Sequence, residues 1–269
     1  MIRFGITGHT GSLGRILIKN KKNIRFNLFK GDIRKKNTIK SWVQRNSFDA
    51  IIHLAAIVPI KVVNHNRKKA YEVNYLGTKN IVDEVLKNKI QWFFFSSTSH
   101  VYKSSRFKLN ENSKKQPISY YGKTKLLAEN YIIKKFKNKE SKFCIGRIFS
   151  TANANQKINY LVPDLKRKIK KTKKKIILND LNHSRDFISM HDISKIIYLL
   201  HHRKYKGIIN IGTGSALSLK EIAKTICKKF KKEYEFKDNK KSTFLVADNT
   251  KLRKLYKFNK KKGIDNLLF

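Results

Sequence analysis

The 269-residue sequence predicts an α/β fold in which a parallel sheet carries helices on both faces. Short runs of β-branched and aromatic residues alternate with longer segments of helical periodicity, as in repeated strand–helix units. The predicted strands are largely apolar along their length, as expected when both faces of a sheet are covered. These runs are IRFGIT (2–7), IRFNLF (24–29), AIIHLAA (50–56), QWFFFSS (91–97) and SKFCIGRIF (141–149).

Helical periodicity is clear between several of these runs. It covers KAYEVNYLGTKNIVDEVLK (69–87) and a segment from about residue 119 to 138. Beyond residue 150 the pattern changes. The sequence predicts a loop, a basic helix, a strand at KKIILND (174–180) and two strand–helix units, and the last helix begins with a capping box at Ser218 and Glu221. We expect residues 1–150 to form one domain and residues 151–269 a smaller lobe that is interleaved with it.

The composition is strongly basic, with 62 Lys and Arg residues against 18 Asp and Glu and a formal net charge of +44. Such a chain attracts polyanions at low salt. Its lysines are spread over the whole sequence, in runs such as KRKIKKTKKK (166–175). We therefore interpret the charge as a compositional bias and keep a dedicated nucleic-acid surface as the alternative.

Cysteines and apolar runs set further expectations. Cys144 and Cys227 lie in no CxxC or Cys/His cluster, so the sequence predicts neither a metal site nor a disulfide framework. The N-terminus enters a strand directly, without the charged and apolar segments of a signal peptide. The longest apolar run, AIIHLAAIVPI (50–60), is too short to cross a bilayer, and we expect a cytoplasmic protein.

A glycine-rich turn follows the first predicted strand. TGHTGSLGRILIK (7–19) places Gly8, Gly11 and Gly14 at three-residue spacing, with a helix predicted from about Ser12. Glycines serve a tight turn, a close approach to a pyrophosphate and the contact of helix with strand, while amides of the first helical turn face the anion. The turn therefore predicts a dinucleotide site.

The acidic residue expected after the second strand for an adenosine ribose is missing. Lys30 stands there, and Asp32 follows one residue after Gly31. Lys30 or Arg34 could pair with a 2′-phosphate, which favours NADP(H). Alternatively, Asp32 lies near the adenine ring or caps the next turn.

Tyr121 and Lys125 have the i, i+4 spacing that puts two side chains on one helix face. An ammonium and a cationic nicotinamide nearby favour the phenolate, and lowering a phenol pKa from about 10 to near 7 requires about 4 kcal/mol. Such a phenol can exchange a proton with a carbonyl or alcohol oxygen while hydride moves. The alternative is a solvated aromatic beside a solvated cation.

Hydroxyl side chains end the predicted strand 91–97, at the edge where ligands of wound sheets bind. They could hold a substrate oxygen, or they could satisfy the backbone of a turn. The four are Ser96, Ser97, Thr98 and Ser99.

Together these motifs resemble the extended short-chain dehydrogenase/reductase family, in its NAD(P)-dependent epimerase/dehydratase branch that acts on nucleotide sugars. TGHTGSLG is similar to TGxxGxxG, HLAA (53–56) to a cofactor contact, and VNYLGTKNIV (73–82) to a central helix with a supporting Asn, here Asn74. SSTSHVY (96–102) resembles SSxxVYG, whose third hydroxyl position is catalytic, and YYGKTK (120–125) resembles YGxSK.

The resemblance continues through the second half. GRIFS (146–150) is similar to RxxN at the floor of the sugar site, and RDFISMHDI (185–193) to a segment that meets the nucleotide diphosphate. NIGTG (210–214) and ADNTKLRKL (247–255) resemble the closing motifs. Three departures are Lys103 in place of glycine, Ser150 in place of asparagine, and a short second strand–helix unit, which leave sugar and cofactor choice open.

The resemblance implies a Rossmann-type domain with a C-terminal substrate-binding lobe, an NAD(P) cofactor and a nucleoside-diphosphate sugar, without a metal; a homodimer stays open. The catalytic residues it implies are Thr98, Tyr121 and Lys125. The cofactor-binding residues are Gly8, Thr10, Gly11, Ser12, Leu13, Gly14, Lys30, Asp32, Ile33, Leu54, Ala55, Ala56, Asn74, Tyr121 and Lys125. The substrate-binding residues are Thr98, Ser99, Tyr121, Ser150, Asn155, Gln156 and Arg185.

Within this family we expect reduction of a 4-keto-hexose by hydride transfer, with Tyr121 as acid/base, because the missing ribose carboxylate favours a reductase that uses NADPH. The alternatives are a 4-epimerase that retains NAD, and a non-catalytic dinucleotide- or nucleic-acid-binding protein on the same fold.

Overall fold

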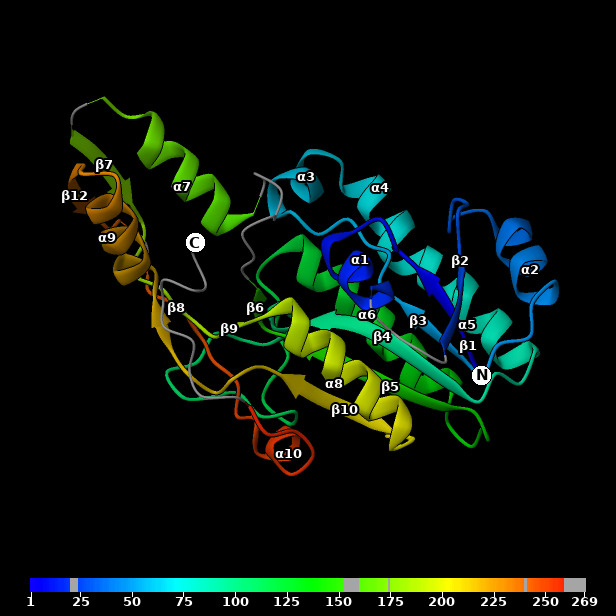
Figure 1. Cartoon of the computed structure of the whole chain (residues 1–269). Coiled ribbons are helices and arrows are strands. Elements are labelled where there is room, and N and C mark those ends of the chain that lie inside the picture. Colours follow the sequence, from blue (N-terminus) through cyan, green and yellow to red (C-terminus); the bar gives the residue numbers. More distant parts are fainter. Residues whose placement is uncertain (20–23, 152–159, 174, 240, 259–269) are drawn as a thin grey trace. The chain divides into compact units, whose positions relative to one another are not determined.

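The computed structural model describes residues 1–19, 24–151, 160–173, 175–239 and 241–258. The chain divides into two compact units, and each contains segments that are distant in sequence (Figure 1). The first unit comprises Met1–Lys103, Lys114–Ile148 and His191–Ile209, and the second comprises Ser104–Ser113, Phe149–Met190 and Asn210–Phe269.

A six-stranded sheet forms the centre of the first unit, in the order β10-β5-β4-β3-β1-β2. The pairs from β2 through β5 are parallel, which confirms the predicted wound sheet. The chain passes from β1 outward to β2 and then returns across β1 to β3, so the direction of winding reverses between β1 and β3. Ligands of wound sheets bind at such a reversal, beyond the carboxyl ends of the strands. The strands are β1 (Ile2–Thr7), β2 (Ile24–Leu28), β3 (Ala50–His53), β4 (Trp92–Thr98), β5 (Lys142–Ile148) and β10 (Gly207–Ile211).

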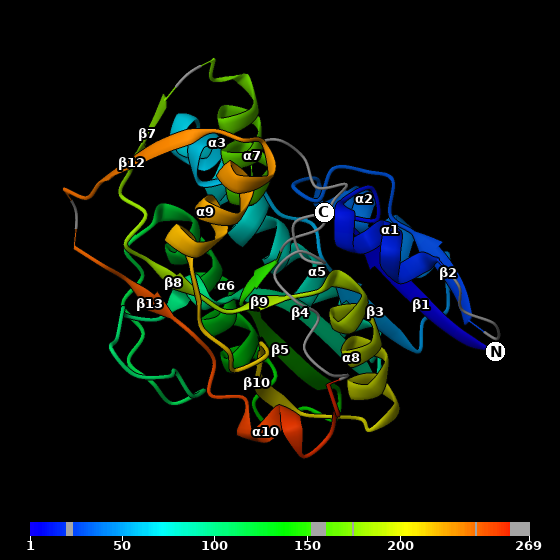
Figure 2. The same ribbon diagram turned by 60° about the vertical axis from the view of Figure 1, so that its left-hand side comes forward.

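Helices cover both faces of this sheet (Figure 2). On one face α2 (Lys36–Gln44), α5 (Gly77–Lys87) and α6 (Tyr120–Lys135) bury a continuous apolar cluster against the strands. On the other face lie α1 (Ser12–Ile18) and α8 (Met190–His202). There Tyr198 stacks on Phe4 with ring centroids 6.0 Å apart, and the Tyr198 hydroxyl donates to the carbonyl of Leu17.

The predicted helix over residues 69–87 is interrupted in the structure. It consists of α4 (Arg67–Tyr71), a π-helical turn η1 (Glu72–Leu76) and α5. Upstream lies the short helix α3 (Ile60–His65), and after β4 comes a single 3₁₀ turn, η2 (Ser99–Val101). A π-helical turn shifts the side chains that follow it around the helix, and such turns are frequent at functional sites.

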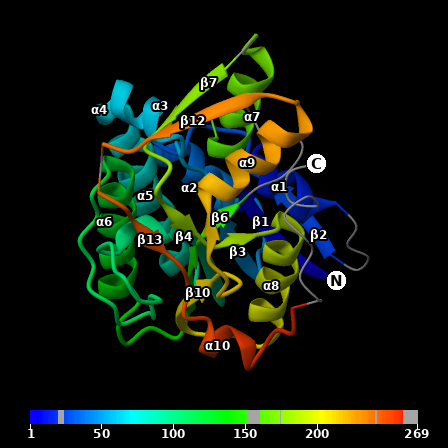
Figure 3. The same cartoon turned by 90° about the vertical axis from the view of Figure 1, so that its left-hand side faces the viewer.

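The second unit has its own apolar core between two helices and a pair of parallel strands (Figure 3). The helices are α7 (Leu161–Lys171) and α9 (Leu219–Lys229), and the strands are β7 (Lys175–Asn179) and β12 (Glu233–Lys237). The predicted capping box at the start of α9 is confirmed, with the Ser218 and Glu221 side chains each accepting a backbone amide. Shorter elements are β6 (Ser150–Thr151), β8 (Ser184–Arg185), β9 (Phe187–Ile188), β11 (Leu217–Ser218), β13 (Phe244–Leu245) and α10 (Thr250–Arg253).

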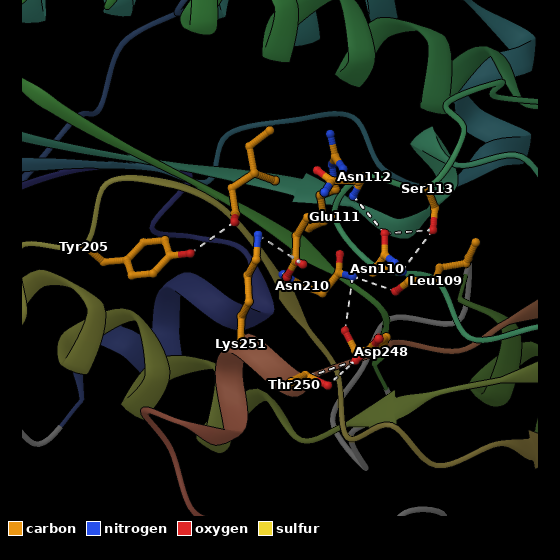
Figure 4. Close-up of polar contacts among 12 residues, drawn as sticks. Leu109, Asn110, Glu111, Asn112, Ser113, Tyr205, Asn210, Asp248, Thr250 and Lys251 are labelled. Carbon is orange, nitrogen blue, oxygen red and sulfur yellow. Dashed lines mark hydrogen bonds and ion pairs between the residues drawn. The ribbon is translucent and has the colours of Figure 1, made fainter.

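Buried polar side chains join the loops of the second unit. Glu111 accepts the Asn210 amide at 2.9 Å and pairs with Lys251 at 3.4 Å, while the Asn210 side chain donates to the Leu109 carbonyl at 2.7 Å (Figure 4). Asp186 accepts the backbone amides of the turn at Thr213 and Gly214, each at 2.8 Å. These bonds satisfy buried carboxylates and fix segments that lack regular structure.

Among the helices of the described residues, none combines the length and the apolar character that crossing a membrane requires.

Candidate active site

The glycine-rich turn lies at the reversal between β1 and β3. Gly8 has φ +74°, and a Cβ there would lie 2.6 Å from the amide nitrogen of Ala55, just after β3. A Cβ on Gly14 would lie 2.5 Å from the carbonyl oxygen of Gly8. Side chains would therefore displace the backbone at both positions. The turn closes with a bond from the Gly11 amide to the Gly8 carbonyl at 3.1 Å, and Gly11 is the N-cap of α1.

These features fit a dinucleotide pyrophosphate. The amides of Ser12, Leu13 and Gly14 belong to the first turn of α1, where backbone N–H groups have no carbonyl one turn earlier within the helix. Thr10 and Gly11 are exposed, so the outer side of the turn is accessible. Leu54, Ala55 and Ala56 follow β3 and are half-buried beside Gly8.

The residues expected near the adenosine lie after β2 in different environments. Lys30 is exposed. Ile33 is buried in the core, where a Cβ on Gly77 of α5 would meet its side chain at 2.6 Å. Its side chain therefore packs against α5.

Asp32 is engaged by Arg34, with the Arg34 Nε atom 2.9 Å from Oδ2 of Asp32. The same guanidinium reaches Glu72 at 3.2 Å. The hydrogen bonds from Arg34 lower the pKa of Asp32 to about 2. The carboxylate of Asp32 is thus held ionised and balanced by Arg34 at this exposed site.

The His53 side chain on β3 is hydrogen-bonded to the neighbouring strand β1 and to helix α5. Its Nδ1 lies 2.6 Å from the Thr7 hydroxyl and its Nε2 lies 2.9 Å from the Thr78 hydroxyl. Because the Thr78 hydroxyl donates to the Asn74 carbonyl at 2.8 Å, it accepts from Nε2–H of His53. Nδ1 then accepts from Thr7. Both ring nitrogens of His53 therefore have hydrogen-bond partners within the first unit.

Burial lowers the pKa of His53 to about 3 and the nearby Lys125 ammonium acts in the same direction, so the folded protein holds this imidazole neutral. In the unfolded chain its pKa is close to 6.5, and unfolding takes up a proton below that pH. The contribution of His53 to stability is complete above pH 6.5 and is lost as the pH falls toward 3. We expect a loss of about 2 kcal/mol between pH 7 and about pH 4.5.

The measurement is urea unfolding of His53→Gln at several pH values from 7.5 to 4.5. The variant is expected to be less stable at neutral pH but to lose less stability on acidification than the parent. His202→Gln, at an exposed position of α8, is the matched control and should keep the parental pH dependence. Equal slopes for His53→Gln and the parent would contradict a neutral, buried His53.

Asn74, expected at the cofactor, is 1% exposed and serves the backbone around the site. Its Oδ1 accepts the Ile57 amide at 2.8 Å, and its Nδ2 donates to the Ile57 carbonyl at 3.0 Å and to the Thr124 hydroxyl at 3.2 Å. Thr124 in turn donates to the carbonyl of Tyr121 at 2.8 Å. Asn74 therefore connects the segment after β3 with the first turns of α6.

Tyr121 and Lys125 lie on the buried face of α6, which excludes the interpretation of two solvated side chains. Tyr121 is 7% exposed and packs with Val63 and Ala70, while Lys125 is 2% exposed. The Lys125 ammonium lies 4.0 Å from the ring centroid of Phe95 on β4. Burial lowers the pKa of Lys125 to about 7 and Glu129 opposes that shift, so the charged and neutral forms are both populated near neutral pH.

Thr98 and Ser99 are buried where β4 runs into η2. The Thr98 hydroxyl accepts the His100 amide at 3.2 Å, so it has the turn-stabilising role of a strand-end hydroxyl. A hydroxyl that accepts one bond can still donate its own proton to a substrate oxygen.

The turn η2 and the beginning of α6 are in direct contact. The His100 ring lies edge-on to the Tyr121 ring, with centroids 6.0 Å apart. A Cβ on Gly122 would collide with the carbonyl oxygen of His100, so glycine is required for this approach. The structure thereby brings the turn that carries Thr98 beside the first turn of α6 that carries Tyr121.

The other expected substrate residues belong to the second unit. Ser150 is half-buried in β6, and Arg185 in β8 donates to the carbonyls of Ser184 at 2.8 Å and Thr243 at 3.2 Å. Burial lowers the pKa of Arg185 to about 10. Asn155 and Gln156 lie outside the described residues.

Two charged residues outside the expected set of site residues are buried behind the site. Glu129 of α6 and Arg147 of β5 form an ion pair at 2.7 Å. The resemblance placed the segment of Arg147 at the floor of a sugar site, but its side chain lies in the core of the first unit. Glu129 follows Lys125 by four residues on the same helix face, and that spacing was the available signal.

Comparisons with known proteins identify the family of the chain. A family model described as GDP-mannose 4,6 dehydratase matches residues 2–268. A GDP-6-deoxy-D-talose 4-dehydrogenase of Aggregatibacter actinomycetemcomitans is 29% identical, over 87% of this chain and 82% of that protein. An ADP-L-glycero-D-manno-heptose-6-epimerase of Brachyspira hyodysenteriae is 31% identical, over 80% of this chain and 72% of that protein.

Solved structures share the fold. RMD from Pseudomonas aeruginosa, complexed with NADPH, superposes with a TM-score of 0.87 at 17% identity, over 100% of this chain and 96% of that chain. The UDP-Glc/GlcNAc 4-epimerase of Campylobacter jejuni gives a TM-score of 0.82 at 23% identity, over 100% and 98% of the two chains. Three observations lead to one assignment. They are the glycine-rich turn at the β1/β3 reversal, the buried face of α6 with Tyr121 and Lys125, and the match along residues 2–268. The chain belongs to the GDP-mannose 4,6-dehydratase family, among the NAD(P)-dependent epimerases and dehydratases of the extended short-chain dehydrogenase/reductases.

Proposed function

We propose that this protein reduces the 4-keto group of a nucleoside-diphosphate hexose. The observation that carries the proposal is the buried face of α6, where Tyr121 and Lys125 lie beside the turn that carries Thr98. The Aggregatibacter relative is named a 4-dehydrogenase of a GDP-deoxyhexose, and a 4-dehydrogenase acts between the 4-hydroxyl and the 4-ketone.

Thr98, Tyr121 and Lys125 carry out the proton transfer to the carbonyl oxygen, and bound NAD(P)H supplies the hydride to the carbonyl carbon. Thr98 donates a hydrogen bond to the carbonyl oxygen and holds it in place. Tyr121 gives that oxygen its proton as the C=O bond becomes a C–OH bond. Lys125, while charged, stabilises the phenolate left on Tyr121 and contacts the ribose of the nicotinamide. A proton from solvent then restores Tyr121.

For the nucleotide sugar, we propose the second unit as the substrate lobe, with Ser150 near the sugar and Arg185 at the diphosphate. A guanidinium can bind a diphosphate through paired hydrogen bonds. Asn155 and Gln156 are proposed with them from their sequence positions alone.

We propose NADP(H) as the preferred cofactor. The basic residues Lys30 and Arg34 follow β2, and Arg34 balances the Asp32 carboxylate that would otherwise repel a 2′-phosphate. Replacement of Arg34 by Ala removes both effects, so KM for NADPH is expected to rise about tenfold or more while KM for NADH stays within about twofold. Steady-state kinetics with both cofactors measure this.

The matched control for Arg34→Ala is Arg45→Ala, at the exposed C-terminal end of α2. It removes the same charge from the same unit and should leave both KM values unchanged. An unchanged preference between the two cofactors in Arg34→Ala would contradict NADP(H) selection by this residue.

The experiment that tests the function uses 4-keto-6-deoxyhexoses linked to GDP, UDP, dTDP and ADP, with NADPH or NADH followed at 340 nm. Stoichiometric oxidation of the cofactor with formation of one sugar alcohol is the expected result. Nucleotide released from the purified protein is identified by mass spectrometry in parallel. Firmly held NAD⁺ together with interconversion of sugars and no net cofactor use would replace the reductase by an epimerase.

Epimerisation is the second candidate, favoured by the Brachyspira relative, which is named an epimerase. It uses the same proton donor but returns the hydride to the sugar. A non-catalytic nucleic-acid-binding role is the third, since the net charge is +44. RNA binding that disappears near physiological salt, beside saturable NADPH binding, would favour the enzyme.

A further inference from the structure

A buried ion pair connects the helix of the candidate site to the central sheet. Glu129 on α6 and Arg147 on β5 have side chains that are 0% and 1% exposed. The pair is bidentate: Nη2 of Arg147 lies 2.7 Å from Oε2 of Glu129, and Nε lies 3.1 Å from Oε1. Such parallel bonds hold the two groups in one relative orientation.

The pair extends into a cluster of four residues, Glu129, Arg147, Ser97 and Tyr102, which we call the α6 anchor. The Ser97 hydroxyl donates to Oε1 of Glu129. Nη1 of Arg147 donates to the Tyr102 hydroxyl at 2.9 Å, and the guanidinium carbon lies 4.8 Å from the Tyr102 ring centroid. The anchor therefore joins α6, β4, β5 and the residue that follows η2.

The anchor lies on the same secondary-structure elements as the candidate catalytic residues. Glu129 follows Lys125 by one helical turn and Tyr121 by two, on the same face of α6. Ser97 directly precedes Thr98 in β4. A change in the Ser97–Glu129 bond would therefore move the strand end with Thr98 relative to the helix face with Tyr121.

Stability alone does not account for such a cluster. Replacing a buried ion pair with apolar residues of similar volume is often neutral or stabilising, because desolvation offsets the attraction between the charges. What a bidentate pair adds over apolar contacts is direction, since its hydrogen bonds prefer nearly linear angles and weaken steeply when strongly bent. Catalytic groups lose rate when displaced by about 1 Å, so a directional connection behind them has a functional effect.

We propose that the α6 anchor is a positioning cluster, which sets the placement of Tyr121 and Lys125 relative to Thr98 and holds a carboxylate one turn from the Lys125 ammonium. This inference rests on the proposed role of these three residues in proton transfer. The anchor itself touches neither substrate nor cofactor in this proposal.

The test compares single and paired replacements. Glu129→Gln leaves Arg147 without its charge partner, and its melting temperature is expected to fall. The double variant Glu129→Leu/Arg147→Met replaces the pair with apolar groups, and its melting temperature is expected to return to within a few degrees of the parent. Its kcat is nevertheless expected to fall about 10- to 100-fold, because the direction of α6 is no longer fixed.

Two readouts separate positioning from a purely structural role. In the double variant the KM for the sugar and the Kd for NADPH are expected to stay within about threefold, and the alkaline limb of the kcat profile is expected to move to lower pH, because Lys125 has lost a carboxylate neighbour. Tyr131→Phe is the matched control, since it removes a bond of 2.6 Å from α6 to Asp83 on α5 and leaves β4 untouched. Its kcat and pH profile should equal those of the parent.

Two conservative substitutions of Ser97 keep the inference testable if the double variant does not fold. Ser97→Ala removes the hydroxyl from Glu129 and keeps the ion pair, and its kcat is expected to fall about 3- to 10-fold, whereas Ser97→Thr, which keeps a hydroxyl, should recover most of it. Parental kcat and pH profile in a folded double variant, or in Ser97→Ala if the double variant does not fold, would overturn the inference.

Failure of the proposed function is recognised separately. If the parent turns over no sugar of the panel, crystal structures of the parent and the variants decide the question. A displacement of the Tyr121 hydroxyl relative to the Thr98 hydroxyl by about 1 Å or more supports the anchor. Unchanged positions overturn it.

Discussion

Replacement of Tyr121 by Phe is expected to lower kcat by about 10²- to 10⁴-fold, the range for loss of a positioned general acid. The phenyl ring can keep the contacts with Val63 and Ala70, because only the hydroxyl is removed. The Kd for NADPH, measured by fluorescence titration, should therefore change by less than about threefold, and the melting temperature should stay close to that of the parent. The rate loss would then be assigned to the missing proton donor.

Tyr120→Phe is the control for this experiment. Tyr120 precedes Tyr121 on α6 and is rotated by about 100° around the helix, and the Arg67 guanidinium lies 5.4 Å from its ring centroid. Loss of its hydroxyl should leave kcat within about twofold of the parent. Near-parental turnover by Tyr121→Phe, or a comparable loss in Tyr120→Phe, would show that Tyr121 is not the proton donor.

Replacement of Gly14 by Ala is expected to abolish cofactor binding, with a rise of Kd of at least about 100-fold. The added Cβ would lie 2.5 Å from the Gly8 carbonyl oxygen and 2.7 Å from the Cα of His9, and both are backbone atoms that cannot rotate away. Relieving the contact requires the turn and α1 to separate, which moves the amides that we propose face the phosphates. The same overpacking should cost about 1–3 kcal/mol of stability.

Gly11→Ala supplies the comparison within the same turn. A Cβ on Gly11 would meet one atom, the Gly8 carbonyl oxygen at 3.2 Å, and Gly11 is exposed with an ordinary extended φ of −70°. We expect a rise in Kd of less than about tenfold and little change in melting temperature. Fluorescence titration with NADPH and thermal unfolding test both variants. Equal cofactor affinities for Gly14→Ala and the parent would contradict the placement of the dinucleotide at this turn.

Much of the fold could be predicted because it depends on local patterns. The apolar runs at residues 2–7, 91–97 and 141–149 correspond to β1, β4 and β5 within one residue at either end. The run at 50–56 overshoots β3, which ends at His53, because Leu54 to Ala56 are apolar but lie beyond the end of the strand. Helix α2 was not predicted, since it buries only Ile39 and Val43 in a segment rich in lysine.

The pairing of the two-residue strands in the second unit had no usable local signal. β8, for example, pairs with β11, more than thirty residues later in the chain, and with β13, about sixty residues later. A strand of two residues has no periodicity of its own, so its existence depends on partners that local sequence does not reveal.

For this protein, the sequence alone determined the wound sheet, the glycine-rich turn and the shared helix face of Tyr121 and Lys125. Each depends on residues within a few positions of one another, where spacing fixes geometry. Only the tertiary structure decided that Arg34 pairs with Asp32 and Glu72, that His53 is held neutral, and that Glu129 and Arg147 form an ion pair in the core. The sequence shows only that these residues are ionisable. The protonation state and the partner of each side chain depend on how deeply the surrounding elements bury it, and burial is a property of the tertiary structure.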